Sequence, residues 1–506
     1  MTGSLIAHEA IGIGIVSVIA ISVLIVADLV KRFTNIPGEH TRKLAHIGSG
    51  LGVLLIPVVI DSSWTVLVLT AGFAGLMFAT HKAGLLQGVH GVERGVGGVL
   101  WYPATAWLVF VIVFDIRDGT YLDYAIPILV LACADAMGAL VGKRWGRHRY
   151  EVIAGHYRSI EGSTAFLLVA MSCIAVPLIV GMSMDPLRAL VVALLVSVVV
   201  TAYEAVSVHG LDNVLVPMGA YLFLERFDDM SWPDLGTQAA LIAGIFGVSL
   251  TLRARHPVSG GGFVAFLLAV HTVLVLGGWQ WLPPLAVLVA VFLVTERMTS
   301  HARDTAPTKT ELGTSLVGLT VPVALVLLHA AVRDEHVRDA LYVAYVASIV
   351  CQGAVQCFLL PQDRGLWSPR LRRVLASREP WQQHPNAGKL TLAVTGALVI
   401  GVPLALAQPS ASGSLPVLGL PLTMLTVGVA LASFITLAGT RPARRECAVC
   451  GTIGMHGYEC CQDDVTPVLT LGGAVAARTL SFRVTYLVAN ISAALAAVAL
   501  GITWMS

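Results

Sequence analysis

The sequence predicts an all-α, polytopic integral membrane protein, and three observations support that fold class. Apolar segments of about 20 residues, long enough to cross a bilayer as a helix, recur along the whole chain. Only 12% of the 506 residues are charged, against roughly 25% in a soluble protein. The mean hydropathy is +0.80, and the apolar segments are too long and too uniform for alternating strands.

The apolar segments predict about sixteen membrane spans, arranged in two halves. The eighth span is short enough to be re-entrant or broken. We expect the spans at residues 10–30, 44–60, 64–80, 96–114, 125–142, 163–184, 187–203, 213–224, 236–252, 262–278, 282–296, 313–331, 340–360, 389–408, 416–438 and 484–504.

The loops between these spans alternate in charge. Lys and Arg concentrate in every second loop, and the loops between them are short, polar or acidic. The positive-inside rule therefore predicts that the basic loops face the cytoplasm and that both termini lie outside. The chain is rich in Ala, Val and Arg, so we expect a bacterial plasma membrane, with an organelle membrane as the alternative. The basic loops are 31–43, 81–95, 142–162, 253–260, 296–311, 361–388 and 439–483.

Polar residues that are unusual in a membrane protein gather on the predicted cytoplasmic side. Asp135 lies about two helical turns from that end of the fifth span. A charge at mid-bilayer costs about 2.5–3.5 kcal/mol on insertion scales, so an ionisable residue inside a span indicates a functional site. The residues that can meet at this surface are Arg42, Lys43, His46, Asp135, Lys143, Arg144, Arg158, Ser159, Glu161, Glu204, Asp212 and Asn213.

These residue types suit a site for a nucleotide and a metal ion. Carboxylates and an amide supply the oxygen ligands that Mg²⁺ prefers. Arg and Lys bind phosphate oxygens, and glycines let backbone N–H groups approach phosphates closely. Each residue alone also has a structural interpretation: Arg42 and Lys43 as membrane anchors, and Asp135 as a hydrogen-bond partner between helices. Their shared face favours a nucleotide site at the lipid interface that acts on a lipid alcohol.

Four motifs follow one another in the N-terminal half: "RKLAH" (42–46), "ADAMGALVGKRWG" (134–146), "RSIEGS" (158–163) and "YEAVSVHGLDNVLVP" (203–217). They resemble, in the same order, the phytol kinase and dolichol kinase family. Members of that family are polytopic membrane kinases that phosphorylate isoprenoid alcohols, typically with CTP. The resemblance covers about residues 30–225. Three departures are mild: Ala134, Gly138 and Arg158 stand where the family usually has Gly, Ala and Lys.

The resemblance implies a role for most of the polar residues. Asp135, Glu204 and, third, His46 would be catalytic, as candidates for the base that activates the alcohol. Mg²⁺ would be held by Asp135, Glu204, Asp212 and Asn213. CTP would be the co-substrate, and its contacts would be Arg42, Lys43, Gly142, Lys143, Arg144, Arg158, Ser159, Glu161, Gly162 and Ser163.

The second half predicts a separate domain. We expect a kinase-like membrane domain at 1–230 and a second multi-span domain at 236–506. Residues 247–304 and 480–501 resemble, loosely, a membrane family that includes phytyl-phosphate kinases, which implies a fusion of two consecutive phosphorylations. That family's acidic motif has no counterpart here. A catalytically degenerate half, a substrate-binding half and an unrelated helical extension are therefore alternatives.

A cysteine-rich loop at 447–461 suggests a structural metal site. It opens with a C-x₂-C pair and continues with further ligand types about ten residues later, a pattern that suits tetrahedral Zn²⁺. Reduced thiols without a metal are the alternative. The candidate ligands are Cys447, Cys450, His456, Cys460 and Cys461.

Two other functions remain as alternatives. A CTP-dependent phosphatidate cytidylyltransferase would share the fold and the nucleotide. A lipid or solute transporter would fit the span count, but it predicts mid-membrane charges in both halves, and the polar cluster belongs to the first half alone. A membrane prenyltransferase is disfavoured because its acidic motifs would have to be "DIRD" (115–118) and "FDD" (227–229), which lie on the opposite side. The expected partners are an isoprenoid alcohol, a nucleoside triphosphate and membrane lipids, and no basic tract indicates nucleic acid.

Overall fold

The computed structural model describes residues 2–34, 36–86, 97–153, 156–207, 210–255, 260–288 and 310–359. The chain divides into two compact units: Met1–Gly277 with Leu327–Arg333, and Gly278–Val326 with Asp334–Ser506. The candidate residues of the N-terminal half all lie in the first unit. The last three expected spans and the cysteine-rich loop lie outside the described residues.

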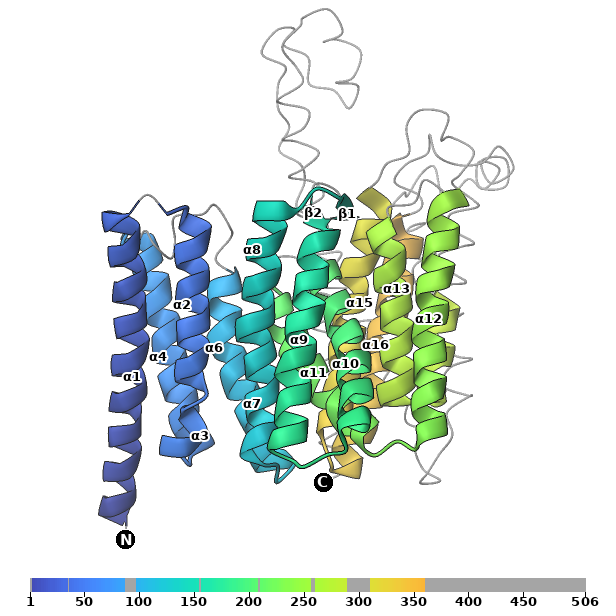
Figure 1. The fold of residues 1–506 in the computed structure, drawn as a ribbon. Helices are drawn as coiled ribbons and strands as arrows, with labels where there is room; N and C mark the ends of the chain where they lie inside the picture. Colours follow the sequence, from blue (N-terminus) through green and yellow to red (C-terminus); the bar gives the residue numbers. More distant parts are fainter. Residues whose placement is uncertain are drawn as a thin grey trace, which may run out of the picture. The chain divides into compact units, whose positions relative to one another are not determined.

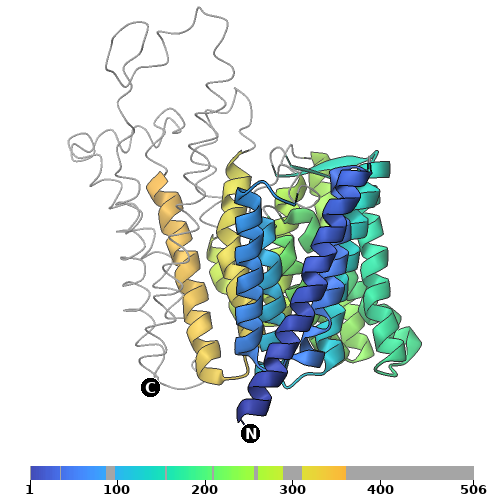
Figure 2. The same cartoon turned by 90° about the vertical axis from the view of Figure 1, so that its left-hand side faces the viewer.

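The first unit is a bundle of helices that stand side by side (Figure 1). Among the described residues, six helical segments are long and apolar enough to cross a membrane, as expected of an α-helical membrane protein. The count of about sixteen spans stays a prediction. The dark-blue helix α1 runs obliquely across the bundle (Figure 2). The α-helices of this unit are α1 (Thr2–Phe33), α2 (Gly38–Val53), α3 (Ile56–Val59), α4 (Ser63–Lys82), α6 (Gly97–Phe110), α7 (Tyr121–Leu129), α8 (Asp135–Trp145), α9 (Ile160–Val180), α10 (Pro186–Val206), α11 (Asp212–Asp228), α12 (Trp232–Arg255) and α13 (Gly260–Thr272).

The second unit holds α16 (Glu335–Leu359), most of α15 (Thr310–Ala331) and a short 3₁₀ turn at Trp279–Trp281. The Tyr345 hydroxyl of α16 donates a hydrogen bond of 2.9 Å to the Trp281 carbonyl oxygen. The Trp281 and Tyr345 rings also pack, with centroids 4.7 Å apart. An aromatic contact with a satisfied hydroxyl therefore fixes α16 against this turn.

The segment that carries Asp135 is longer than the span expected at 125–142. Helices α7 and α8 are joined by a π-helical turn at Val130–Ala134, so Tyr121–Trp145 is helical throughout. The segment begins where the Asp123 carboxylate accepts a hydrogen bond of 2.7 Å from the Thr120 backbone N–H. Pro127, which has no N–H to donate, lies just before the π turn. Single π turns of this kind occur frequently at functional sites, and Asp135 is the first residue after this one.

Helices α8 and α9 approach each other closely because glycines form their contact. A Cβ added to Gly162 of α9 would lie 2.8 Å from the Gly138 carbonyl oxygen and 3.0 Å from the Gly142 Cα. Gly138 and Gly142 are four residues apart, the small-residue spacing that lets membrane helices pack backbone to backbone. The glycines of "GALVGKRWG" therefore bring the end of α8 directly against the start of α9.

The loop between α8 and α9 is not an irregular connection but an antiparallel hairpin of β1 (Arg149–Ile153) and β2 (His156–Ser159). This pair of strands is the one departure from the all-α expectation among the described residues. The register pairs Arg149 with Ser159 and Tyr150 with Arg158. Ser159 then caps α9, since its hydroxyl accepts a hydrogen bond of 3.1 Å from the Gly162 N–H. Strand β2 thus leads straight into the glycine contact.

Helix α10 lies at the centre of the first unit. Within its most apolar stretch 67% of the residues are buried inside the protein, against 22% for α4. Its Val196 packs with Phe166 of α9 and Phe223 of α11 in one apolar core. Because α10 is enclosed by protein, a carboxylate on it can be shielded from lipid.

We expect Gly162→Ala to destabilise the first unit and Gly75→Ala to leave it intact. Alanine favours a helix over glycine at both positions by about 1 kcal/mol, so the two substitutions differ only in their surroundings. The added methyl at residue 162 meets backbone atoms that cannot yield, whereas Gly75 has open space. Overpacking should cost Gly162→Ala about 1–3 kcal/mol of unfolding free energy. Thermal unfolding in detergent measures this, and equal melting temperatures for the two variants would contradict the close helix contact.

Candidate functional site

Two side chains of α2 face Asp135. The Lys43 Nζ lies 2.5 Å from Asp135 Oδ2, and the His46 Nε2 lies 3.2 Å from the same oxygen. Lys43 and His46 are three residues apart, which puts them on one face of the helix. Lys43 is only 2% exposed, so its ammonium group is neutralised inside the protein by this carboxylate.

His46 is held by further contacts. Its Nε2 lies 3.1 Å from the Leu131 carbonyl oxygen of the π turn, and a carbonyl can only accept. Nε2 therefore carries the hydrogen. The Tyr102 ring packs against His46 with centroids 4.7 Å apart, and its hydroxyl donates to the His46 carbonyl oxygen over 3.4 Å. The Nε2–H of His46 thus donates to the Leu131 carbonyl oxygen, and this bond holds the imidazole ring beside Asp135.

A second ion pair joins the hairpin to α10 and α11. The Arg158 Nη1 lies 2.8 Å from Glu204 Oε1, and its Nη2 lies 3.6 Å from Asp212 Oδ2. Arg158 also donates to the Glu204 backbone carbonyl over 3.2 Å, at the end of α10. Burial lowers the pKa of Arg158, but the charges of Glu204 and Asp212 outweigh that effect and raise it, so the guanidinium stays charged.

The two ion pairs meet in a cluster of three carboxylates. Asp135, Glu204 and Asp212 each offer an oxygen, and these oxygens lie within 4.8 Å of one another. Lys43 and Arg158 balance two of the three negative charges. The excess negative charge and the oxygen-only donors fit Mg²⁺. Asn213 is buried next to the cluster, and its backbone N–H donates to Asp212 Oδ1 over 3.2 Å.

A polar cleft of about 190 Å³ adjoins this cluster. Glu204 and Arg158 belong to both, so the cleft reaches the carboxylates. Helix α9 begins in the cleft, and its N-terminal end carries the partial positive charge that favours anions. The cleft is lined by Glu39, Gly138, Ala139, Gly142, Lys143, Arg149, Tyr157, Arg158, Ser159, Gly162, Ser163 and Glu204.

Six of the ten residues expected to contact a nucleotide line this cleft, namely Gly142, Lys143, Arg158, Ser159, Gly162 and Ser163. The other four lie elsewhere. Arg42 pairs with Glu39, and Lys43 with Asp135. The Arg144 guanidinium lies over the Trp145 ring, 5.1 Å from its centroid. The Glu161 carboxylate lies 2.7 Å from His148 Nδ1 and also accepts from the His148 backbone N–H.

Three residues of the cleft are absent from the sequence interpretation. Glu39 is 3% exposed, pairs with Arg42 and lies 3.5 Å from Lys143 Nζ, so it positions two cations. Glu39 lies three residues before Arg42 at the start of a predicted span, and this spacing could have indicated the ion pair between them. Arg149 and Tyr157 come from the hairpin. The alternation of side chains in a hairpin could have placed them together, had the strands been recognised.

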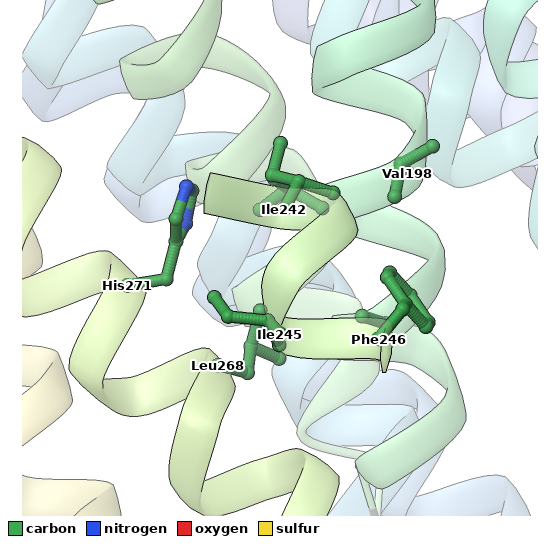
Figure 3. Close-up of a pocket in the computed structure, with 8 residues that line it drawn as sticks. Val198, Ile242, Ile245, Phe246, Leu268 and His271 are labelled. Carbon is green, nitrogen blue, oxygen red and sulfur yellow. The ribbon is translucent and has the colours of Figure 1, made fainter. Parts of the chain in front are cut away.

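A second, smaller cavity lies lower on α10. It holds about 20 Å³ between α10, α12 and α13 and is lined by apolar side chains and His271 (Figure 3). His271 is 2% exposed, and neither ring nitrogen has a hydrogen-bond partner among the described residues. Its ring stacks on Phe223 with centroids 5.7 Å apart. The cavity is large enough for about one water molecule and is separate from the carboxylate cluster.

The phytol kinase of Synechocystis sp. (strain ATCC 27184 / PCC 6803 / Kazusa) is 32% identical to this chain over 212 residues, which are 42% of this chain and 89% of that protein. The chain belongs to the phytol kinase family. The match covers part of the chain, so it supports the phytol kinase part of the resemblance. The resemblance of the C-terminal half to phytyl-phosphate kinases stays a prediction. No family model matches the chain, and no solved structure matches it.

The cysteines of the N-terminal half are separate from the predicted zinc ligands. Cys133 and Cys173, in the family-like half of the chain, are free thiols of intermediate burial. The expected zinc ligands Cys447, Cys450, His456, Cys460 and Cys461 lie outside the described residues, so the zinc site stays a prediction.

We expect Lys43→Met to destabilise the protein strongly, because it leaves the Asp135 carboxylate buried beside a neutral side chain. Removing one partner of a buried ion pair costs about 3–5 kcal/mol of unfolding free energy. The double variant Lys43→Met/Asp135→Asn should regain most of this loss. Lys82→Met is the matched control, because Lys82 is exposed and should change stability by less than about 0.5 kcal/mol. Unfolding of the single and double variants in detergent measures these free energies. Strictly additive losses from Lys43→Met and Asp135→Asn would contradict a stabilising ion pair between the two residues.

Proposed function

We propose that this protein is a membrane kinase that transfers the γ-phosphoryl group of a nucleoside triphosphate to an isoprenoid alcohol. The observation that carries the proposal is the cluster of Asp135, Glu204 and Asp212, which adjoins a cation-lined cleft through Glu204. Membership of the phytol kinase family supplies the substrate class. We propose CTP as the donor, on the sequence resemblance, and phytol, geranylgeraniol or a polyprenol as the acceptor.

In this proposal the nucleotide phosphates occupy the cleft. Lys143 and Arg158 face them as cations, and the first turn of α9 presents backbone N–H groups. The glycine contact between α8 and α9 keeps side chains out of the cleft floor, so that phosphates can approach the backbone. Phosphoryl transfer needs mainly such positioning and charge stabilisation.

Asp135, Glu204 and Asp212 would hold Mg²⁺. When bound, the ion would neutralise charge on the phosphate oxygens. Lys43 and Arg158 keep the three carboxylates close together by balancing part of their charge. Glu39 does the same for Arg42 and Lys143 on the other side of the cleft.

Glu204 is the proposed acceptor of the proton from the alcohol hydroxyl. It lines the cleft, and its ion pair with Arg158 is made through Oε1. Asp135 is less suited, because it does not line the cleft and both Lys43 and His46 lie against its carboxylate. His46 is less suited as well, because its Nε2 carries a hydrogen. We assign His46 to positioning Asp135.

The alcohol would enter from the bilayer, since its chain is apolar and its hydroxyl must reach a site at one end of the helices. Following the positive-inside rule, we place that end in the cytoplasm, where nucleotides are available. A bacterial plasma membrane is the proposed location.

The decisive test is a product analysis with purified protein in nanodiscs, Mg²⁺, labelled CTP or ATP, and phytol or geranylgeraniol. We expect the γ-phosphate label in a lipid monophosphate. Asp212→Asn should lower the rate about 10²- to 10³-fold, as expected for loss of a charge that stabilises the transition state. Glu225→Gln is the control on the same helix, because Glu225 pairs with Arg117 and lies 13 residues along α11.

Other products would point to the alternatives. A CDP-lipid formed from phosphatidate, with release of diphosphate, would indicate a cytidylyltransferase. A lipid diphosphate as well as the monophosphate would indicate that the second half is also active. No labelled lipid with any donor and alcohol would refute the kinase proposal, and a transport assay would follow.

We also expect the rate to depend on Mg²⁺ through Asp212. Protein stripped with EDTA should be inactive until Mg²⁺ is added. Asp212→Asn should need a Mg²⁺ concentration at least about 10-fold higher for half-maximal rate, because one carboxylate of the cluster is neutral. Glu225→Gln should keep the wild-type requirement. A lower rate in Asp212→Asn at every Mg²⁺ concentration, with an unchanged half-maximal concentration, would mean that Asp212 does not act on the metal.

A further inference from the structure

We propose that the exposed face of the β1–β2 hairpin is the nucleobase subsite of the cleft, with the base stacked on the Tyr157 ring and Arg149 contacting the adjoining phosphate. The proposal rests on the proposed function, since it assumes that the cleft takes a nucleoside triphosphate. It concerns two residues that neither the sequence motifs nor the carboxylate cluster includes.

The two faces of the hairpin are used differently. In antiparallel strands, paired residues share a face and neighbours along a strand alternate. Tyr150 and Arg158 are paired, and both bond to the bundle: the Tyr150 hydroxyl lies 2.8 Å from Ser163 Oγ, and Arg158 pairs with Glu204. Arg149 and Tyr157 lie on the other face, since each neighbours one member of that pair along its strand. Ser159 shares this face and is buried where it caps α9, but Arg149 and Tyr157 are exposed and are therefore available to a ligand.

Tyr157 is an aromatic side chain without a structural partner. It is 60% exposed and yet lines the cleft. Among the described residues, none forms a hydrogen bond, ring contact or ion pair with it. Tyr150, by contrast, is partly buried with its hydroxyl bonded. An exposed ring at the wall of a phosphate cleft suits a base, because every nucleobase has a π-face that can stack.

Arg149 is the cation of this face. Of the three cations that line the cleft, Lys143 lies 3.5 Å from Glu39 and Arg158 lies 2.8 Å from Glu204. Arg149 is exposed and has no ion pair among the described residues. Its charge is therefore available to an incoming anion. An arginine next to an aromatic ring combines a bidentate phosphate contact with a stacking surface.

The order of residues along β2 follows the order of the parts of a nucleotide. Arg158 contacts the carboxylate cluster and Ser159 caps α9, so this end of the strand belongs to the phosphates. Tyr157 precedes Ser159 by two residues, which is about 6.6 Å along an extended strand. A triphosphate beside Arg158 and Ser159 would therefore place its nucleoside towards Tyr157.

The test compares the binding of CTP with that of inorganic triphosphate, both with Mg²⁺ and no alcohol, to protein in nanodiscs. Tyr157→Ala should weaken CTP binding about 5- to 150-fold, the range that base stacking contributes, and leave triphosphate binding unchanged. Tyr157→Phe should keep wild-type affinity for both. Trp145→Ala is the matched control, because Trp145 is an exposed aromatic on α8 outside the cleft lining. Arg149→Gln should weaken both ligands by similar factors.

Each contrary outcome has a distinct meaning. Equal losses for CTP and triphosphate in Tyr157→Ala, or no loss for either, would overturn the subsite while the kinase proposal stands. Wild-type protein that binds neither ligand would overturn the subsite together with the nucleotide part of the proposed function. The lipid phosphorylation assay on the same preparation separates these cases, because a kinase active with phytol but unaffected by Tyr157→Ala contradicts the subsite alone.

Discussion

The balance of charge around three carboxylates governs how the first unit is built. Asp135, Glu204 and Asp212 come from three different helices, and their oxygens lie within 4.8 Å of one another. Like charges this close repel strongly in a medium of low polarity. Lys43 from α2 and Arg158 from β2 offset that repulsion. Helix α2 and the hairpin are therefore as necessary to the cluster as the helices that carry the acids.

One short part of the chain supplies most of the cleft. Between Asp135 and Ser163 the chain provides a carboxylate, the glycine floor, the cations and the helix end that faces the cleft. The close glycine contact of α8 with α9 and the Ser159 cap position these parts relative to one another. Helix α2 then contributes Glu39 and Lys43 from outside this part, and α10 and α11 contribute Glu204 and Asp212. Most of the residues that line the cleft are therefore positioned by contacts within one short part of the chain.

Hydropathy predicts how far along a helix a residue lies, but not which way it faces. Asp135, Glu204 and Asp212 were expected together because all three lie at the same end of their spans, and they do meet. Lys43 was expected to face a nucleotide, and the structure turns it to Asp135, because rotation about the helix axis depends on packing between distant segments. The hairpin escaped prediction because a short polar loop carries little apolar periodicity. The roles of these residues stay predictions.

The π turn at Val130–Ala134 changes the direction in which the side chains of the following helix α8 point around the helix axis. In an α-helix each residue advances by about 100° around the axis, since a turn takes 3.6 residues. One additional residue in the turn therefore rotates everything after it by about that angle. The stripe of α7 that packs in the apolar core and the stripe of α8 that carries Asp135 and its glycines are thus offset around one continuous rod. A single segment can in this way present an apolar side at one depth and a polar side at another without breaking.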